Sequence, residues 1–304
     1  MRTQTCTVVG ESKMAIRLSD YKSTVHSQHG EDGVIAAIFE AIGIKSRTCV
    51  EFGAYDLYDS SNVHPLWTTG WKTLLIEGNA RRYHKLLVDY ANHPGSADLH
   101  VSFANKFVDA DGPNSLDNIL SEFDFPVDLD LVVMDVDGLE YHIWQGCKRF
   151  LPRLAIVEYN CMIPHNIELI GAARGNDIGC SALSLAKLGQ QKGYSLVACI
   201  EWNAFFVRRE YAHLFADADN LDALFDPKYI RYAMQSYLGE VFFSGPLLLD
   251  YQPFRRDTDL IDTCSVTIGH LGDTLSFMTK RTLWQYGRKA KHRLLGPPRR
   301  KAEY

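Results

Sequence analysis

Short apolar runs alternate with segments of helical hydrophobic spacing along residues 25–208. Nearly continuous apolar runs predict strands at residues 48–52, 73–76, 99–103, 129–134, 154–157, 194–200 and 204–207. Apolar positions that recur every three or four residues predict helices at residues 33–42, 81–90, 115–123, 140–150 and 183–192. This alternation predicts an α/β fold with a mostly parallel sheet that carries helices on both faces.

The last two predicted strands are separated only by Glu201-Trp202-Asn203, which predicts a tight antiparallel hairpin at the end of the sheet. Beyond Arg208 the alternation is lost, and residues 210–250 are expected to be helical. We therefore divide the chain into three parts. These are an N-terminal extension (1–24), an α/β domain (25–208) and a helical C-terminal extension with a basic tail (209–304).

Composition excludes several classes of protein. The chain has 304 residues, 46% hydrophobic content and a net charge of −5, which favours a well-packed core and argues against general nucleic-acid binding. No stretch reaches 18 apolar residues, and the N-terminal sequence has no signal-peptide pattern. Seven scattered cysteines without a CxxC pair are expected to be buried free thiols, so we expect a cytoplasmic protein.

The basic tail, residues 280–301, contains nine Lys or Arg residues and no acidic residue. We expect a solvated end of the chain. The alternative is attraction to an anionic membrane surface or to a polyanionic substrate.

Residues 47–78 contain two short strands that each end in a glutamate beside a glycine. The first ends in Glu51-Phe52-Gly53-Ala54 and the second in Glu77-Gly78, and the two glutamates lie 26 residues apart. A strand, a glycine turn and an acidic residue about 20 residues later is the layout that holds a nucleoside, because the carboxylate accepts both ribose hydroxyls. The alternative is a pair of buried strands with ordinary turns.

Oxygen ligands follow several of the predicted strands, and parallel strands bring their carboxyl ends to one crevice. Repulsion among so many carboxylates destabilises the fold unless a cation or a polyhydroxyl ligand is present. Such ligands suit Mg²⁺, Mn²⁺ or Ca²⁺. Asp137 also fits the N-cap of the helix that starts at Glu140, which would leave it structural. The strand-end residues are Glu51, Glu77, Asp135, Asp137, Glu158 and Asn160, of which the last four are the predicted metal ligands.

His165 follows the fifth strand and is a candidate general base, although a lone loop histidine is more often a surface residue. No HxH or HExxH pair occurs, so no zinc site is expected. Asp135-Val136-Asp137-Gly138 also matches the short nucleophile motif of phosphohydrolases. That motif usually opens a domain, whereas here it follows three predicted strands.

With these residues laid out, the chain resembles the FkbM-like group of class I S-adenosylmethionine (SAM) methyltransferases over about residues 25–208. The resemblance implies a Rossmann-like methyltransferase sheet with a terminal antiparallel hairpin. It rests on the order and spacing of the following segments: Ser27-Gln28-His29-Gly30-Glu31-Asp32-Gly33, Glu51-Phe52-Gly53-Ala54, Ser61-Asn62, residues 70–77, residues 135–140, Glu158-Tyr159-Asn160, residues 192–194 and residues 203–207.

The resemblance also implies roles for individual residues. Asp135 lies beneath the sulfonium and the acceptor, where it is expected to be catalytic together with His165. Asp135 or Asp137, with Glu158 and Asn160, looks similar to the metal site of metal-using O-methyltransferases. The cofactor-binding residues that the resemblance implies are Glu51, Gly53 and Ala54 at the methionine end, Asn62, Glu77 at the ribose, Asn105 near adenine, and Asp135.

These implications point to O-methylation of a hydroxyl on a glycan, a sugar-containing molecule or a natural product. A divalent cation is a candidate cofactor beside SAM, and a homodimer is the default assembly. One departure stands out, because the family commonly has Asp-Gly after the first glycine and this chain has Asp56-Leu57. A leucine there crowds or widens the turn. The alternatives are therefore a non-catalytic nucleotide- or glycan-binding protein and a phosphohydrolase that uses Asp135.

Overall fold

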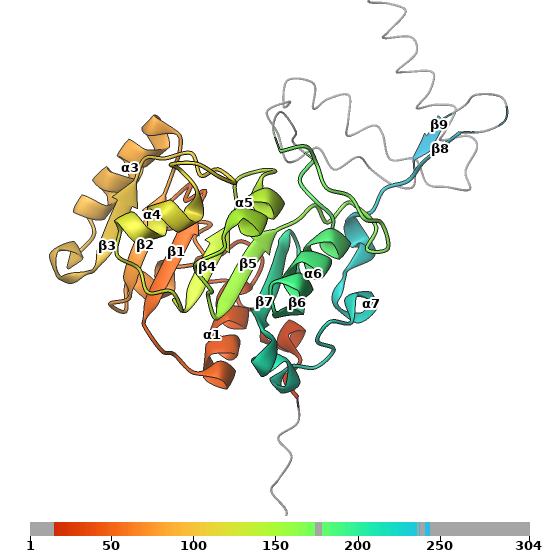
Figure 1. Cartoon of the computed structure of the whole chain (residues 1–304), viewed down its shortest axis with the longest axis horizontal. Helices are drawn as coiled ribbons and strands as arrows, with labels where there is room; N and C mark the ends of the chain where they lie inside the picture. The colour runs from red at the N-terminus through yellow and green to blue at the C-terminus, as the bar shows by residue number, and fades with distance from the viewer. Residues whose placement is uncertain (1–14, 174–177, 236, 238–240, 244–304) are drawn as a thin grey trace, which may run out of the picture. The chain divides into compact units, whose positions relative to one another are not determined.

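The computed structural model describes residues 15–173, 178–235, 237 and 241–243, and the chain divides into two units after Lys228. The first unit is built on a seven-stranded sheet in the order β3-β2-β1-β4-β5-β7-β6 (Figure 1). Neighbours from β3 to β5 are parallel, and β7 is antiparallel to both β5 and β6. The predicted fold class is confirmed. The strands are β1 (Thr48–Phe52), β2 (Lys72–Ile76), β3 (Val101–Ala104), β4 (Leu131–Met134), β5 (Leu154–Glu158), β6 (Tyr194–Ile200) and β7 (Asn203–Arg208).

Helices pack on both faces of this sheet. On one face, apolar residues of α1 (Glu31–Ile42), α2 (His64–Trp67) and α3 (Ala80–Ala91) share a buried cluster with alternate residues of β1, β4, β5 and β7. On the other face, Gly189 of α6 (Ala182–Gln191) lies so close to Phe206 and Trp144 that an added Cβ would contact both rings. Trp144 belongs to α5 (Glu140–Gly146), and α4 (Leu116–Glu122) precedes β4.

Every strand and helix predicted for residues 33–207 is present, with ends that differ by a few residues. The largest difference is the end of α5, which stops at Gly146 instead of residue 150. The Asp117 carboxylate accepts hydrogen bonds from the N–H groups of Lys148, Arg149 and Phe150, which gives these donors partners outside a helix. Helix α2 was not predicted, because four residues are too few to show a period.

Both predicted extensions contribute residues to the first unit. Ile16 pairs with the segment after η3 (Arg209–Leu214), since its N–H donates to Leu214 and its carbonyl accepts from Ala216. Leu18 and Phe215 are buried in the same core cluster as α1. The remaining short elements are η1 (Leu18–Tyr21), η2 (Ser96–Asp98), α7 (Leu221–Leu224) and η4 (Pro227–Tyr229).

The helix predicted over residues 210–250 is corrected by the structure. The described part of this segment contains only short helices and then a two-stranded antiparallel sheet, formed by β8 (Ala233–Gln235) and β9 (Val241–Phe243). Short extended runs of this kind lack the period that distinguishes strand from helix. Residues 1–14 and the basic tail lie outside the described residues.

Two further expectations concern single residue types and membrane insertion. The five cysteines among the described residues are free and buried, as the sequence predicted. Within the described ranges, no helix has the length and apolar character needed to cross a membrane.

A buried ion pair holds the amino ends of the central strands. Asp130 is fully buried, 3.0 Å from the guanidinium of Arg153, and it accepts the N–H groups of Ser46 and Arg47. Arg153 also donates to the carbonyl of Ile42 at the end of α1. Because each charge has several hydrogen-bond partners, the cost of burying it is offset. The contacts fix the starts of β1, β4 and β5 relative to α1.

At the opposite, carboxyl edge, the backbones of β1 and β4 approach closely at Gly53. Its φ is +79°, and a Cβ added there would lie 1.4 Å from the carbonyl oxygen of Asp135. The N–H of Asp135 donates to the carbonyl of Phe52, which holds the two strand ends at this distance. Only glycine combines this conformation with this proximity.

We predict that Gly53→Ala destabilises the protein more than Gly70→Ala, a matched control. Gly70 has a similar φ of +83°, but an added Cβ there meets no atom within 4 Å. The control should cost only about 1 kcal/mol of unfolding free energy for the left-handed conformation. Gly53→Ala should cost about 1–3 kcal/mol more because of the clash. Urea unfolding of both variants measures the difference, and equal losses would contradict the close approach.

Candidate functional site

The carboxyl edge of the sheet carries one row of polar residues. Strand register pairs Phe52 with Ile76 and with Met134, Met134 with Val157, and Glu158 with Asn203. One residue further along the parallel strands, the same register aligns Glu77, Gly53, Asp135 and Glu158. Residues in register lie on the same face of a sheet. On this face, the residues two positions earlier in the parallel strands, such as Leu75, Val133 and Ile156, belong to the core cluster that includes α1 and α2. The aligned residues, from β2 to β7, are Glu77, Gly53, Asp135, Glu158 and Asn203.

Glu77 stands at the end of β2 and is 6% exposed. Its Oε1 accepts the N–H of Asn79 at 2.6 Å, while Oε2 accepts no hydrogen bond from the described residues. The side chain of Asn105, predicted near adenine, donates to the carbonyl oxygens of Glu77 and Gly78 at 2.7 and 3.1 Å. In this structure Asn105 therefore fixes the turn that carries Glu77.

Phe107 forms an exposed aromatic surface against Gly78, the residue that follows Glu77. Its side chain is 74% exposed, and its ring lies on Gly78, where an added Cβ would come within 2.4 Å of the ring. Tyr55, also exposed, stacks on the guanidinium of Arg82 at 4.2 Å. Phe107 was not among the predicted site residues, since a single phenylalanine in a loop gives no sequence signal of its exposure.

The carboxylate of Glu51 binds the loop that follows β1. Glu51 is 4% exposed, and its carboxylate accepts the hydroxyl of Ser61 and the N–H of Asn62, both at 2.8 Å. Burial raises the pKa of Glu51 to about 7, although these hydrogen bonds oppose the increase. Glu51 and Asn62 thus hold the loop that follows β1, with Ala54 buried beneath it.

Leu57, the departure from the family pattern, is fully buried in the core cluster shared with α1. Its neighbour Asp56 accepts the N–H of Tyr58 and forms an ion pair with Lys85 at 2.6 Å. These hydrogen bonds keep the pKa of Asp56 below its ordinary value although partial burial opposes them. The structure therefore accommodates Leu57 as an anchor for the loop.

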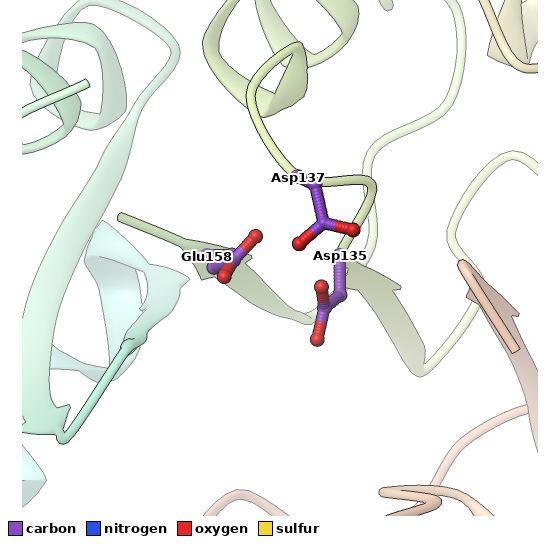
Figure 2. Close-up of side chains that lie close together, drawn as sticks. All are labelled: Asp135, Asp137 and Glu158. Carbon is purple, nitrogen blue, oxygen red and sulfur yellow. The ribbon is translucent and has the colours of Figure 1, made fainter. Parts of the chain in front are cut away.

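Three carboxylates gather at the ends of β4 and β5. Figure 2 shows Asp135, Asp137 and Glu158 around one space, and one oxygen from each lies within 4.8 Å of the others. Burial raises the pKa of Asp135 to about 7, and the negative charges of Glu140 and Asp137 add to the increase. Burial raises the pKa of Glu158 well above its ordinary value, and the negative charges of Asp135, Glu140 and Asp137 add to the increase. A proton or a cation is needed here to offset the repulsion.

The turn that carries Asp137 is held by Glu140, which is 2% exposed. Its carboxylate accepts the N–H groups of Val136 at 2.8 Å and Gly138 at 3.0 Å. Asp137 has a φ of +61°, and it does not cap α5, whose N-cap residue is Leu139. The N-cap alternative for Asp137 is therefore wrong, and its exposed carboxylate is available to the cluster.

Two other predicted site residues have separate contacts. Asn160 donates to the carbonyl of Ile178 at 3.0 Å and accepts the N–H of Met162 at 2.9 Å, so it ties both ends of the loop after β5. His165 lies 2.8 Å from the carboxylate of Asp222 and against the ring of Phe225. Neither of these contacts joins His165 to the carboxylate cluster, and its role as a base stays a prediction.

Comparisons with known proteins give similarity only at the level of three-dimensional structure. No family model matches the chain, and no curated protein matches it. Magnesium protoporphyrin IX methyltransferase from Synechocystis PCC 6803, solved with bound SAM, has a TM-score of 0.38 at 12% identity, covering 59% of this chain and 77% of that one. The CcbJ methyltransferase from Streptomyces caelestis has a TM-score of 0.38 at 12% identity, covering 63% and 96%.

A SAM-dependent methyltransferase from Aquifex aeolicus has a TM-score of 0.35 at 12% identity, covering 57% of this chain and 87% of that one. All three similar structures are methyltransferases; one was solved with bound SAM and one is described as SAM-dependent. At such identities and TM-scores, any function for this chain has to rest on its own residues.

We predict that stability without metal falls as pH rises through 7. The folded-state pKa of Asp135, about 7, exceeds its ordinary value of 3.8, so the folded state binds more protons between these values. The stabilisation is full below pH 4 and lost above pH 7. Urea unfolding in chelator should show a smaller loss between pH 5 and 8 for Asp135→Asn, and an unchanged loss for exposed Asp59→Asn. Equal pH profiles for all three proteins would contradict the raised pKa of Asp135.

Proposed function

We propose that the chain is a SAM-dependent methyltransferase of the FkbM-like group. In this proposal it transfers a methyl group to a hydroxyl of a glycan, a sugar-containing molecule or a natural product. The observation that carries the proposal is the row Glu77, Gly53, Asp135 and Glu158, aligned by strand register on one face of the sheet. Its two ends differ in chemistry, since Glu77 stands alone near an aromatic ring and the other carboxylates cluster.

Glu77 and Phe107 supply what a nucleoside needs. The Oε2 atom of Glu77 is left over after Asn79 has bound Oε1, which suits it to accept ribose hydroxyls. The exposed face of Phe107, supported from behind by Gly78, offers a stacking surface for a base. When bound, SAM supplies the electrophilic methyl group, and the chain's own contribution is to hold it in line with an acceptor.

Asp135, Asp137 and Glu158 fit a divalent cation. Three carboxylate oxygens that lie within 4.8 Å of one another match the separation of ligands around one ion. A hard cation bound there supplies Lewis-acid stabilisation of a deprotonated hydroxyl. The cluster also serves proton transfer by itself, because a carboxyl group with a pKa near 7 is suited to general base catalysis at neutral pH. Both uses favour an oxygen acceptor.

We predict that S-adenosylhomocysteine, the demethylated product, binds and that Glu77→Gln weakens its binding about 10- to 100-fold. The expected loss corresponds to a hydrogen bond that involves a charged group. Phe107→Ala should cost about tenfold through lost stacking. Glu122→Gln is the control, because this exposed residue forms an ion pair with Lys106 and is not among the proposed contacts of the nucleoside. Calorimetric titration measures all four affinities, and equal affinity in wild type and Glu77→Gln would contradict the ribose assignment.

Methyl transfer from labelled SAM to a panel of sugars and polyphenols tests the activity itself. Binding of the cofactor product without transfer to any acceptor would favour the non-catalytic binding protein.

We predict that the protein binds Mn²⁺ and that Asp137→Asn weakens this binding about tenfold or more. Asp137 is exposed and held in place by the turn around Glu140, so its substitution removes a ligand without opening the core. The control is Asp59→Asn, another exposed carboxylate. Electron paramagnetic resonance of free Mn²⁺ measures both affinities. The assignment fails if Asp137→Asn and the control bind as tightly as wild type.

A further inference from the structure

Asn203, the first residue of β7, continues the polar row beyond Glu158. Its Cα pairs with that of Glu158 in the antiparallel ladder between β5 and β7. The N–H of Tyr159 donates to the carbonyl of Trp202 at 2.7 Å, so the hydrogen-bonded pair is Tyr159 and Trp202. Glu158 and Asn203 therefore form a non-hydrogen-bonded pair, in which opposing side chains lie closest. Their side chains are neighbours on the α1 face of the sheet.

Glu31 fixes the amide of Asn203. Its Oε1 accepts a hydrogen bond from Nδ2 of Asn203 at 3.1 Å, and its Oε2 accepts the N–H of His29 at 2.7 Å. Glu31 is 1% exposed at the start of α1, so both oxygens of this buried carboxylate have partners. The amide nitrogen of Asn203 is thus bound to Glu31 of α1, and this hydrogen bond sets the position of the amide oxygen.

The amide oxygen of Asn203 has no hydrogen-bond partner in the structure. Asn203 is 7% exposed, and Oδ1 is among the buried polar atoms left unsatisfied. A buried acceptor without a donor costs free energy that a purely structural contact would avoid. Next to Glu158, such an oxygen repels the Glu158 carboxyl group when that group is ionised, as it is when it binds a cation, and the oxygen adds negative potential to the neighbouring cluster.

From this geometry we propose that Asn203 is a positioning residue of the carboxylate site. Its amide oxygen, oriented by Glu31, directs the Glu158 carboxylate away from β7 and toward Asp135 and Asp137, where it binds a divalent cation. This inference rests on the cation site of the proposed function. The inference also assigns a function to Glu31 and to the segment Ser27–Gly33 that contains it. This segment links α1 to the site through the hydrogen bond between Glu31 and Asn203.

A structural role alone would be to hold α1 against β7, and it predicts a loss of stability without a change in the site. The test is therefore Mn²⁺ affinity, measured by electron paramagnetic resonance, together with S-adenosylhomocysteine affinity and urea unfolding. The variants are Asn203→Leu and, in case leucine prevents folding, the smaller Asn203→Ser. The matched control is Ser195→Ala, which also removes a buried, unpaired polar atom from the β6–β7 hairpin, at the end where Ser195 pairs with Val207.

We expect the dissociation constant for Mn²⁺ to rise about 10- to 100-fold in the Asn203 variants, as for other groups that orient a metal ligand. It should change less than about twofold in Ser195→Ala, and the affinity for S-adenosylhomocysteine should stay unchanged in all variants. Wild-type affinity for Mn²⁺ in folded Asn203 variants would overturn the inference, and so would a wild-type protein that binds no Mn²⁺. If the wild type fails only to bind S-adenosylhomocysteine, the methyltransferase proposal falls while the Mn²⁺ comparison still decides the role of Asn203.

Discussion

Repulsion between Asp135 and Glu158 is the interaction on which the rest of this site depends. Neither carboxyl group can move far from the other, because the parallel pairing of β4 with β5 sets both strand ends side by side. The fold tolerates their proximity by raising both pKa values, so that a proton is retained near neutral pH. Because uncompensated negative charge here costs free energy, the site favours the binding of a proton or a cation.

The residues around the cluster hold its carboxylates in place and do not reduce the repulsion between them. Glu140 adds a further buried carboxylate, yet its oxygens are used to hold the turn of Asp137. Gly53 lets β1 press against the backbone of Asp135, and as a glycine it contributes no side chain to the row between Glu77 and Asp135. The row therefore has a glycine at its centre, flanked by a carboxylate suited to a ribose and by carboxylates suited to an acceptor hydroxyl.

The sequence predicted the sheet well, since continuous apolar runs and helical spacing are local properties that burial in a parallel sheet makes strong. It also predicted which acidic residues end the strands, because strand ends follow from the same pattern. It did not predict which of them stay available. Glu51 and Asn160 bind backbone groups 11 and 18 residues away along the chain, and these partners depend on how the loops fold.

Phe107 and Asn203 were missed as site residues for a related reason. The ring of Phe107 lies against Gly78, 29 positions earlier, and the amide nitrogen of Asn203 is held by Glu31, 172 positions earlier. The two members of each pair lie too far apart along the chain for a local sequence pattern to connect them. The segment around Glu31 did stand out as a motif, but its connection to the sheet became visible only through the hydrogen bond to β7.

The most direct test of this account is a crystal structure of the protein grown with S-adenosylhomocysteine and Mn²⁺, with anomalous data collected at the manganese edge. The account predicts the ribose hydroxyls on Glu77, the adenine ring against Phe107, and an anomalous peak among Asp135, Asp137 and Glu158. A nucleoside bound elsewhere on the chain, or manganese bound away from these carboxylates, would contradict it.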